Sequence, residues 1–188
     1  RFLNRKELAL SAGAGALIAF NWGLYIYAVN SGHILEGSLA YFINPILNVA
    51  IGVVFFKENF PFPMKAAVFF ATIGIVYKIS FIPGFPWISL SLALSFASYG
   101  VVKKLSKIPV RISSVLEAAA GLIPAIIFAC IFRSESTFNL TTSDWLLLAG
   151  GGVVTGVPLF LFSFAAQRIP YSVLGMIQFI APSLQFLV

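Results

Sequence analysis

Residues 21–45, NWGLYIYAVNSGHILEGSLAYFINP, decide the fold because they join two apolar segments through a short polar turn. The second segment carries Pro45, with Asn44 directly before it and Tyr41 four residues earlier. A proline inside a helix leaves a carbonyl without its donor, and polar groups are costly in lipid unless they find partners. This stretch therefore predicts two membrane-spanning helices with a polar site near the proline.

The composition of the whole chain is that of an integral membrane protein. Hydrophobic residues make up 60% of its 188 residues and charged residues 10%, whereas soluble domains have about half and a quarter. The mean hydropathy is +0.98. We therefore expect an all-α, polytopic transmembrane bundle that has the lipid bilayer as its first partner.

The reactive side chains are too few for several kinds of chemistry. Cys130 is the single cysteine and His33 the single histidine, which excludes an internal disulfide and a multi-histidine metal site. We expect no metal and no cofactor. The net charge of +6 comes from cations in short loops between apolar segments, so it indicates membrane topology and not nucleic-acid binding.

Seven segments are long and apolar enough to span a bilayer, which takes about 20 residues. They are residues 8–29, 35–56, 64–80, 86–103, 112–132, 144–166 and 171–188. Turn signals such as IPGFP at 82–86 separate them, and Asp144 is expected to cap the sixth.

The cations predict that the N-terminus of the chain is cytoplasmic. With seven alternating spans, ten of the twelve Lys and Arg residues then fall at cytoplasmic helix ends, as the positive-inside rule requires. These ten are Arg1, Arg5, Lys6, Lys57, Lys65, Lys103, Lys104, Lys107, Arg111 and Arg168, and the outer two are Lys78 and Arg133.

The chain also contains a weak internal repeat. A shift of 137 residues, from 45 to 182, places Pro45 on Pro182 and matches the first two segments to the last two. The same shift aligns Gly15 and Ala19 with Gly152 and Gly156, a small-residue spacing that predicts close helix packing. Because the matched units are an odd number of spans apart, they must cross the membrane in opposite directions.

An inverted repeat of this kind predicts more helices than the chain contains. We assign residues 1–80 to the last three helices of a first five-helix repeat, and residues 81–188 to the first four of a second. The parent protein would then have ten spans. Secondary transporters are built this way, with the substrate site near the midplane between the repeats.

Polar residues share helix faces with the two prolines, which predicts a substrate pathway there. The alternative is that these amides only bond across helices and hold them together. The predicted pathway residues are Asn21, Tyr25, Tyr41, Asn44, Pro45, Asn48, Gln178, Pro182 and Gln185.

Three carboxylate and imidazole positions complete the candidate site. Glu117 lies inside the fifth segment on one face with Ser113, where an ionisable group is functional by default. It could exchange protons and couple transport to a gradient, or it could be a structural partner of a backbone group or a loop cation. Asn30, His33 and Glu36 lie at the first turn and are candidates for a gate or rim. Glu36 could instead cap the second segment, and His33 and Glu36 could also contact the substrate.

These residues also resemble a known family. The run 21–52 followed by Phe55, Phe56, Lys57 and Glu58, together with SLALSFASYGVVKK, LEAAAGLIP and LGMIQFIAPSLQFL, is similar to the RarD branch of the EamA, drug/metabolite transporter superfamily. Tyr27 and Ala40 stand where the resemblance leads us to expect Trp and Gly. The resemblance implies ten helices in two inverted repeats, a bacterial inner-membrane location, and export or exchange of small metabolites or drugs by alternating access.

The leading hypothesis is therefore a secondary transporter and not an enzyme, with a small-molecule substrate and protons as partners and a homodimer as one candidate assembly. A helical scaffold or assembly subunit without transport is the first alternative. An intramembrane enzyme that uses His33 and Glu36 as acid and base is the second, but the chain lacks HExxH and GxSxG motifs.

Overall fold

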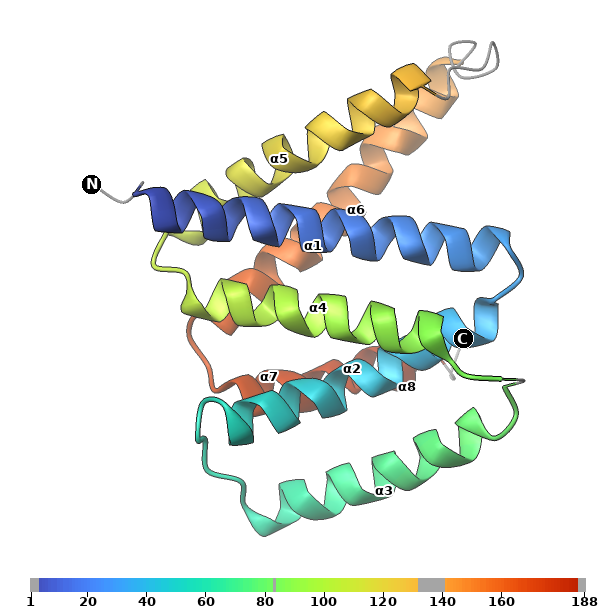
Figure 1. Ribbon diagram of the computed structural model, residues 1–188, viewed down its shortest axis with the longest axis vertical. Helices are drawn as coiled ribbons and strands as arrows, with labels where there is room; N and C mark the ends of the chain where they lie inside the picture. Colours follow the sequence, from blue (N-terminus) through green and yellow to red (C-terminus); the bar gives the residue numbers. More distant parts are fainter. Residues whose placement is uncertain (1–3, 83, 132–140, 186–188) are drawn as a thin grey trace.

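The protein is a bundle of helices in the computed structural model, which describes residues 4–82, 84–131 and 141–185 (Figure 1). Six of these helices are long and apolar enough to cross a membrane. They are α1 (Arg5–Asn30), α2 (Ile34–Val54), α3 (Phe62–Ile79), α4 (Trp87–Leu105), α5 (Val110–Ile131) and α6 (Thr142–Ala166). The all-α, polytopic fold class predicted from the sequence is confirmed.

The last predicted segment, 171–188, begins with two short helices in place of one long one. These are α7 (Tyr171–Gln178) and α8 (Ile180–Gln185), separated at Phe179. Pro182 explains the break, because it has no N–H to donate to the carbonyl four residues earlier, at Gln178. Residues 186–188 lie outside the described part of the chain.

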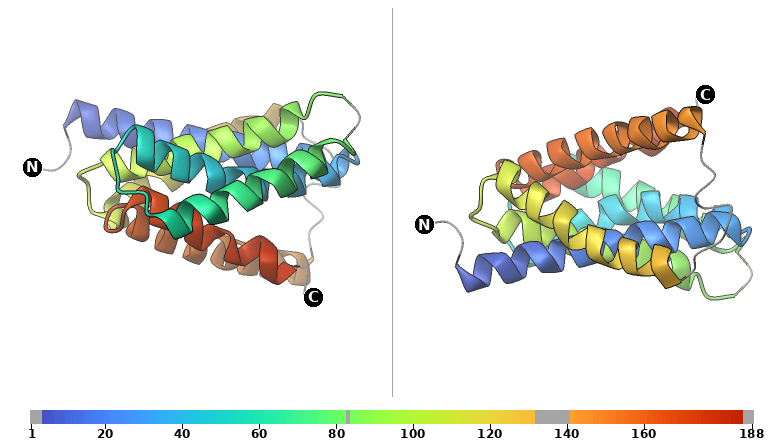
Figure 2. Two further views of the ribbon diagram at one scale, coloured as in Figure 1. Left: turned by 90° about the horizontal axis from the view of Figure 1, so that it is seen from below. Right: turned by 90° about the horizontal axis from the view of Figure 1, so that it is seen from above.

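The connections between helices lie alternately at the two ends of the bundle (Figure 2). The start of α1 shares one end, here called the amino-terminal end, with the α2–α3, α4–α5 and α6–α7 connections. The α1–α2 and α3–α4 connections and the start of α6 lie at the opposite end. Most described cations belong to segments at the amino-terminal end, whereas Lys78 lies near the C-terminal end of α3. Arg1 and Arg133 are outside the described residues, and the cytoplasmic orientation stays a prediction.

α2 occupies the centre of the bundle, where it packs against α3, α4 and α7. Glycines allow the closest of these approaches. A Cβ atom added to Gly175 of α7 would lie 2.7 Å from the carbonyl oxygen of Pro45, and one added to Gly15 would lie 3.0 Å from the carbonyl oxygen of Glu117. Gly15 thus packs closely, as expected. Within the described part of the chain Gly152 and Gly156 make no such approach, because a Cβ at either meets no described atom within 4 Å.

The start of α6 has the predicted cap in a modified form. Thr141 is the N-cap, and its side chain accepts a hydrogen bond from the Asp144 N–H. The Asp144 carboxylate accepts the N–H of Thr141 in return, at 2.8 Å. Asp144 is therefore the reciprocal member of a capping box and not the cap itself.

We predict that Gly175→Ala lowers the thermal unfolding midpoint of the complete gene product in detergent, measured by circular dichroism. The added methyl would overlap the α2 backbone at Pro45, and such overpacking costs about 1–3 kcal/mol. Gly74→Ala in α3 is the matched control, since its Cβ meets no described atom within 4 Å. Equal midpoints for the two variants would contradict this close contact.

Candidate functional site

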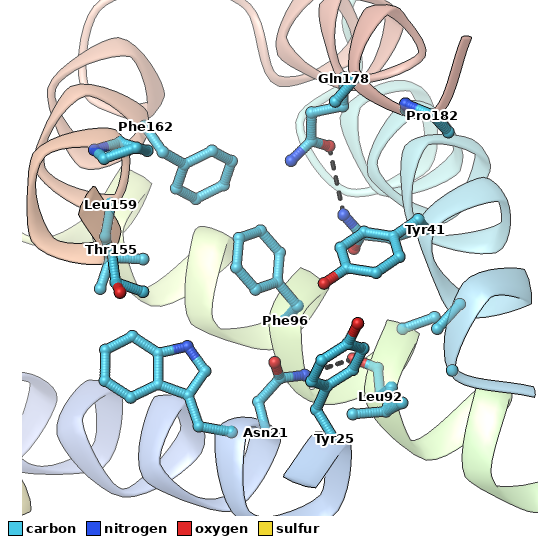
Figure 3. Close-up of a pocket in the computed structure, with 17 residues that line it drawn as sticks. Asn21, Tyr25, Tyr41, Leu92, Phe96, Thr155, Leu159, Phe162, Gln178 and Pro182 are labelled. Atoms are coloured by element: carbon cyan, nitrogen blue, oxygen red, sulfur yellow. Dashed lines mark hydrogen bonds between the residues drawn. The ribbon is translucent and has the colours of Figure 1, made fainter. Parts of the chain in front are cut away.

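A cavity of about 400 Å³ lies between α1, α2, α4, α6 and the α7–α8 pair (Figure 3). Its lining is mainly apolar and aromatic, with a few amides and hydroxyls, and none of its described lining residues carries a charge. Six of the nine predicted pathway residues line it: Asn21, Tyr25, Tyr41, Asn44, Gln178 and Pro182. Ligand pockets commonly combine such apolar walls with a few placed polar groups.

The other three predicted pathway residues do not line the cavity. Pro45 and Asn48 are fully buried on α2. Gln185 ends α8, and its side chain lies outside the described part of the structure. The polar face of α2 is thus divided. Tyr41 and Asn44 line the cavity, whereas Pro45 and Asn48 lie in the protein interior.

Three amides connect α2 to the C-terminal end of α7. The Nδ2 atom of Asn44 donates to Oε1 of Gln178 at 3.3 Å, and Nδ2 of Asn48 donates to the same oxygen. The carbonyl oxygens of Asn44 and Asn48 are buried without a hydrogen-bond partner among the described residues. The amides therefore do bond across helices, as the alternative interpretation held, and Asn44 and Gln178 also border the cavity.

Asn21 and two tyrosines form the polar part of the opposite wall. The Nδ2 atom of Asn21 donates to the carbonyl of Leu92 at 2.8 Å and to Oγ of Ser95 at 2.9 Å, which joins α1 to α4. Tyr25 and Tyr41 meet edge to face, with ring centroids 5.9 Å apart. Figure 3 shows their hydroxyl groups turned toward each other.

Aromatic residues that the sequence did not single out as site residues complete the cavity. Phe96 of α4 and Phe162 of α6 both line it, and their ring centroids are 5.0 Å apart. Trp22, Thr155 and Pro158 also contribute. Pro158 aligns with Asn21 in the internal repeat, which was the one available signal for a site position on α6.

Glu117 does not line the cavity but forms a buried ion pair with Lys103. Its Oε1 lies 2.6 Å from Nζ of Lys103, which also donates to Oγ of Ser113 at 2.6 Å. The side chains of Lys103 and Glu117 are 1% and 6% exposed. Lys103 is therefore not a loop cation, as the charge count assumed. The i, i+4 spacings of Tyr99 with Lys103 and of Ser113 with Glu117 could have revealed two facing polar pairs.

One aromatic layer separates this ion pair from the cavity. The Tyr99 hydroxyl donates to Oε2 of Glu117 at 3.1 Å and lies 2.9 Å from Oγ of Ser163. The Tyr99 ring stacks on Phe162, with centroids 6.1 Å apart and an interplanar angle of 21°. Phe162 also lines the cavity, so two stacked rings lie between Glu117 and the cavity.

The three predicted rim residues lie at the opposite end. Nδ1 of His33 is 3.2 Å from Oε1 of Glu36, whose Oε2 accepts the N–H of Ile88 at 3.3 Å. The carbonyl of Glu36 accepts the Ser89 hydroxyl at 2.7 Å. The carboxylate therefore bonds to the first turn of α4, and it also lies in the first turn of its own helix, where its negative charge is favourable. Asn30 is exposed at the last position of α1.

Glu58, which sequence reasoning missed, closes the amino-terminal end. It lies between α2 and α3 and accepts the N–H groups of Tyr171 and Ser172, each at 2.7 Å, at the start of α7. Lys104 lies 3.6 Å from Oε1 of Glu58 and donates to the carbonyl of Ile169 at 2.9 Å. Lys57, directly before it, has a φ of 53°, in the left-handed region that is uncommon outside glycine.

The surroundings of Glu58 favour its ionised form. Burial by itself raises the pKa of this carboxyl, but the hydrogen bonds from the Ser172 and Tyr171 backbone and the Ser172 hydroxyl, together with the positive charge of Lys104, outweigh it. The pKa of Glu58 therefore lies below its ordinary value of 4.5. In the sequence Glu58 was only one of the residues that carry the family resemblance, and it was not predicted as a site residue.

A second group of contacts closes the same end. Oε2 of Glu7 accepts the Ser106 hydroxyl at 3.2 Å and the N–H of Lys107 at 3.3 Å. Nε2 of Gln167 donates to the carbonyl of Ile108 at 3.0 Å. These bonds join the start of α1 and the α6–α7 connection to the α4–α5 connection.

Comparison with known proteins finds bacterial relatives. The chain is 37% identical over 188 residues to an uncharacterized transporter of Pseudomonas aeruginosa. The aligned region covers 98% of this chain and 63% of that protein. It is 40% identical over 186 residues to Protein RarD of Streptomyces exfoliatus, covering 97% and 59%. It is 36% identical over 177 residues to the uncharacterized transporter YojE of Bacillus subtilis, covering 93% and 59%. The chain thus spans less than two thirds of the length of these curated relatives. No family model matches the chain, and no solved structure matches it.

We predict that Glu58→Gln lowers the thermal unfolding midpoint at neutral pH, because hydrogen bonds to a charged group contribute about 1.5–3 kcal/mol. A carboxyl whose folded-state pKa is lowered adds stability above its ordinary pKa and loses this contribution as the pH falls through the folded value. The difference between wild type and variant should therefore be constant above about pH 5.5 and shrink below pH 4.5. A difference that stays constant down to pH 3 would contradict the assignment.

Proposed function

We propose that this chain, which belongs to the RarD branch of the EamA, drug/metabolite transporter superfamily, forms the substrate-binding part of a secondary transporter for small metabolites or drugs. The chain is part of a multi-pass bacterial membrane protein, and its relatives are named as uncharacterized transporters or as Protein RarD. The observation that carries the proposal is the uncharged cavity between α1, α2, α4, α6 and the α7–α8 pair, which is bordered by the bonded amides of Asn44 and Gln178.

The helix directions support two inverted repeats. α1 runs from the amino-terminal end to the opposite end, while α6 runs back, and α2 and the α7–α8 pair are opposed in the same way (Figure 2). We assign residues 1–80 and 81–188 to the two repeats of a ten-span parent. The cavity then lies where the repeats meet, as it does in secondary transporters with inverted repeats.

The two ends of the bundle differ in a way that supports alternating access. On α2 and α4 the cavity residues, from Gly37 to Asn44 and from Leu92 to Phe96, belong to the helix halves nearer the opposite end. At the amino-terminal end, Glu58 and Glu7 bind neighbouring connections. We propose that this end is cytoplasmic, in a bacterial inner membrane, and that the described state is closed there.

Proton coupling through Glu117 completes the proposal. A proton on its carboxylate would remove the ionic partner of Lys103, which is 1% exposed and would then carry a buried charge without compensation. The pair would have to rearrange, and Tyr99 and Phe162 would transmit that rearrangement to the cavity. A scaffold protein would need neither this cluster nor the cavity.

We predict that Tyr41→Ala reduces transport by the complete gene product in proteoliposomes by at least about tenfold. Tyr41 lines the cavity and packs on Tyr25, so its loss removes one wall. Uptake is measured with a radiolabelled solute selected beforehand by its thermal stabilisation of the purified protein. Tyr77→Ala, at an exposed tyrosine of α3, is the matched control and should transport normally. Equal uptake by both variants would refute the cavity as the substrate site.

We predict that Glu117→Gln abolishes the stimulation of uptake by an imposed pH gradient, while the exchange of labelled for unlabelled solute persists. Glutamine keeps the size of the side chain but cannot take up and release a proton. The double variant Lys103→Met/Glu117→Gln removes the unpaired ammonium and provides a second test in case the single variant unfolds. Gradient stimulation that persists in both variants would refute proton coupling through Glu117.

A further inference from the structure

The side-chain amides of Asn44, Asn48 and Gln178 form a cluster at the cavity in which some hydrogen-bonding groups have no partner among the described residues. Oε1 of Gln178 accepts from both Asn44 and Asn48, while the carbonyl oxygens of these two asparagines have no partner among the described residues. Asn44 is 9% exposed and Asn48 is fully buried. Buried polar atoms without a partner are uncommon in folded proteins, so these two require a physical explanation.

A terminal amide presents an acceptor on one side and a donor on the other, so turning it by half a turn exchanges the two. If all three amides turn together, the nitrogen of Gln178 donates to the carbonyl oxygens of Asn44 and Asn48. Two cross-helix bonds remain, and the unpaired groups become the two asparagine nitrogens. The arrangements are therefore comparable in their number of hydrogen bonds.

Rotation of the Gln178 amide changes the hydrogen-bonding group that the cavity presents to a ligand. Figure 3 shows Gln178 with its oxygen on the bond to α2 and its nitrogen turned toward the side where Phe162 lies. In this arrangement the cavity presents an N–H donor. In the other arrangement the carbonyl of Gln178 would face the same space and present an acceptor.

The rest of the lining restricts which ligands can enter. The described lining residues carry no charge, and burying an ion without a partner is far more costly than burying a neutral polar group. Tyr25 and Tyr41 on one side and Phe96 and Phe162 on the other provide the ring faces and edges that aromatic groups pack against.

We infer that the cavity binds uncharged, ring-containing molecules, and that Gln178 contacts their hydrogen-bonding group as donor or as acceptor by turning its amide. The inference rests on the proposed role of the cavity as the substrate site, and it adds the class of substrate. A site of this kind accepts many neutral ring compounds of similar size and rejects their ionised analogues.

Three probes of similar size test the inference. Acetophenone only accepts hydrogen bonds, indole donates one through its N–H, and benzoate is a charged analogue of acetophenone. Their binding to the complete gene product in nanodiscs is measured by equilibrium dialysis of the radiolabelled compounds, with empty nanodiscs as the blank. Wild type should bind acetophenone and indole with affinities within about fivefold of each other, and benzoate at least about 100-fold more weakly.

Two variants of Gln178 separate the donor role from the acceptor role. Gln178→Met has no strong hydrogen-bonding group and should weaken both neutral probes about fivefold. Gln178→Glu keeps the acceptors for Asn44 and Asn48 but has no N–H when ionised. It should therefore retain indole and weaken acetophenone at least about fivefold. Asn59→Asp, at an exposed amide in the α2–α3 connection, is the control and should leave all three affinities unchanged.

Three results would overturn the inference. They are benzoate binding as tight as that of the neutral probes, failure of the neutral probes to bind wild type, and equal effects of Gln178→Glu on indole and acetophenone. Each of these would leave the proposed function intact if Tyr41→Ala still blocked transport. The proposed function fails separately, when Tyr41→Ala transports as well as Tyr77→Ala.

Discussion

The contact between α2 and α7 is the constraint on which the rest of the described structure depends. Gly175 has no side chain, so α7 can approach the Pro45 carbonyl closely enough for Asn44 and Asn48 to reach Gln178. Without this approach, the amides would face lipid or an empty gap, where unpaired polar groups cost several kcal/mol. The same contact sets the position of α8, which follows α7 directly and supplies Pro182 to the cavity.

Charged and uncharged chemistry are kept apart within the bundle. The cavity has amides, hydroxyls and rings, while the buried charges of Lys103 and Glu117 lie behind Tyr99 and Phe162. In a low-dielectric interior an ion pair acts on its neighbours more strongly than it would in water. The stacked rings of Tyr99 and Phe162 therefore keep the charges from direct contact with the cavity.

The sequence predicted the fold and the two facing walls of the site, because hydropathy, proline and helical spacing are local signals. Tyr41 and Asn44 follow from these signals, and Gln178 and Pro182 follow from them together with the internal repeat. Phe162 does not, since nothing local distinguishes it among 20 phenylalanines.

The partners of the charged residues were also difficult to predict from the sequence. A lysine at the end of a span resembles a loop cation, and only the packing of α5 against its neighbours shows that Lys103 is buried. Glu36 likewise bonds to the start of α4, and Glu58 bonds to the start of α7 from a distant connection. The partners of Glu36 and Glu58 lie more than 50 residues away along the chain, so no local pattern could indicate them.

The middle of α2 and the segment that follows it differ in how they are held. Near its middle, Pro45 meets Gly175 by close backbone packing, which water cannot replace. Beyond its end, Glu58 meets α7 through charge-assisted hydrogen bonds, which water can replace at a modest net cost. We therefore expect the α2–α7 contact to act as a pivot and the Glu58 contact to open, because only the second can separate without leaving a void.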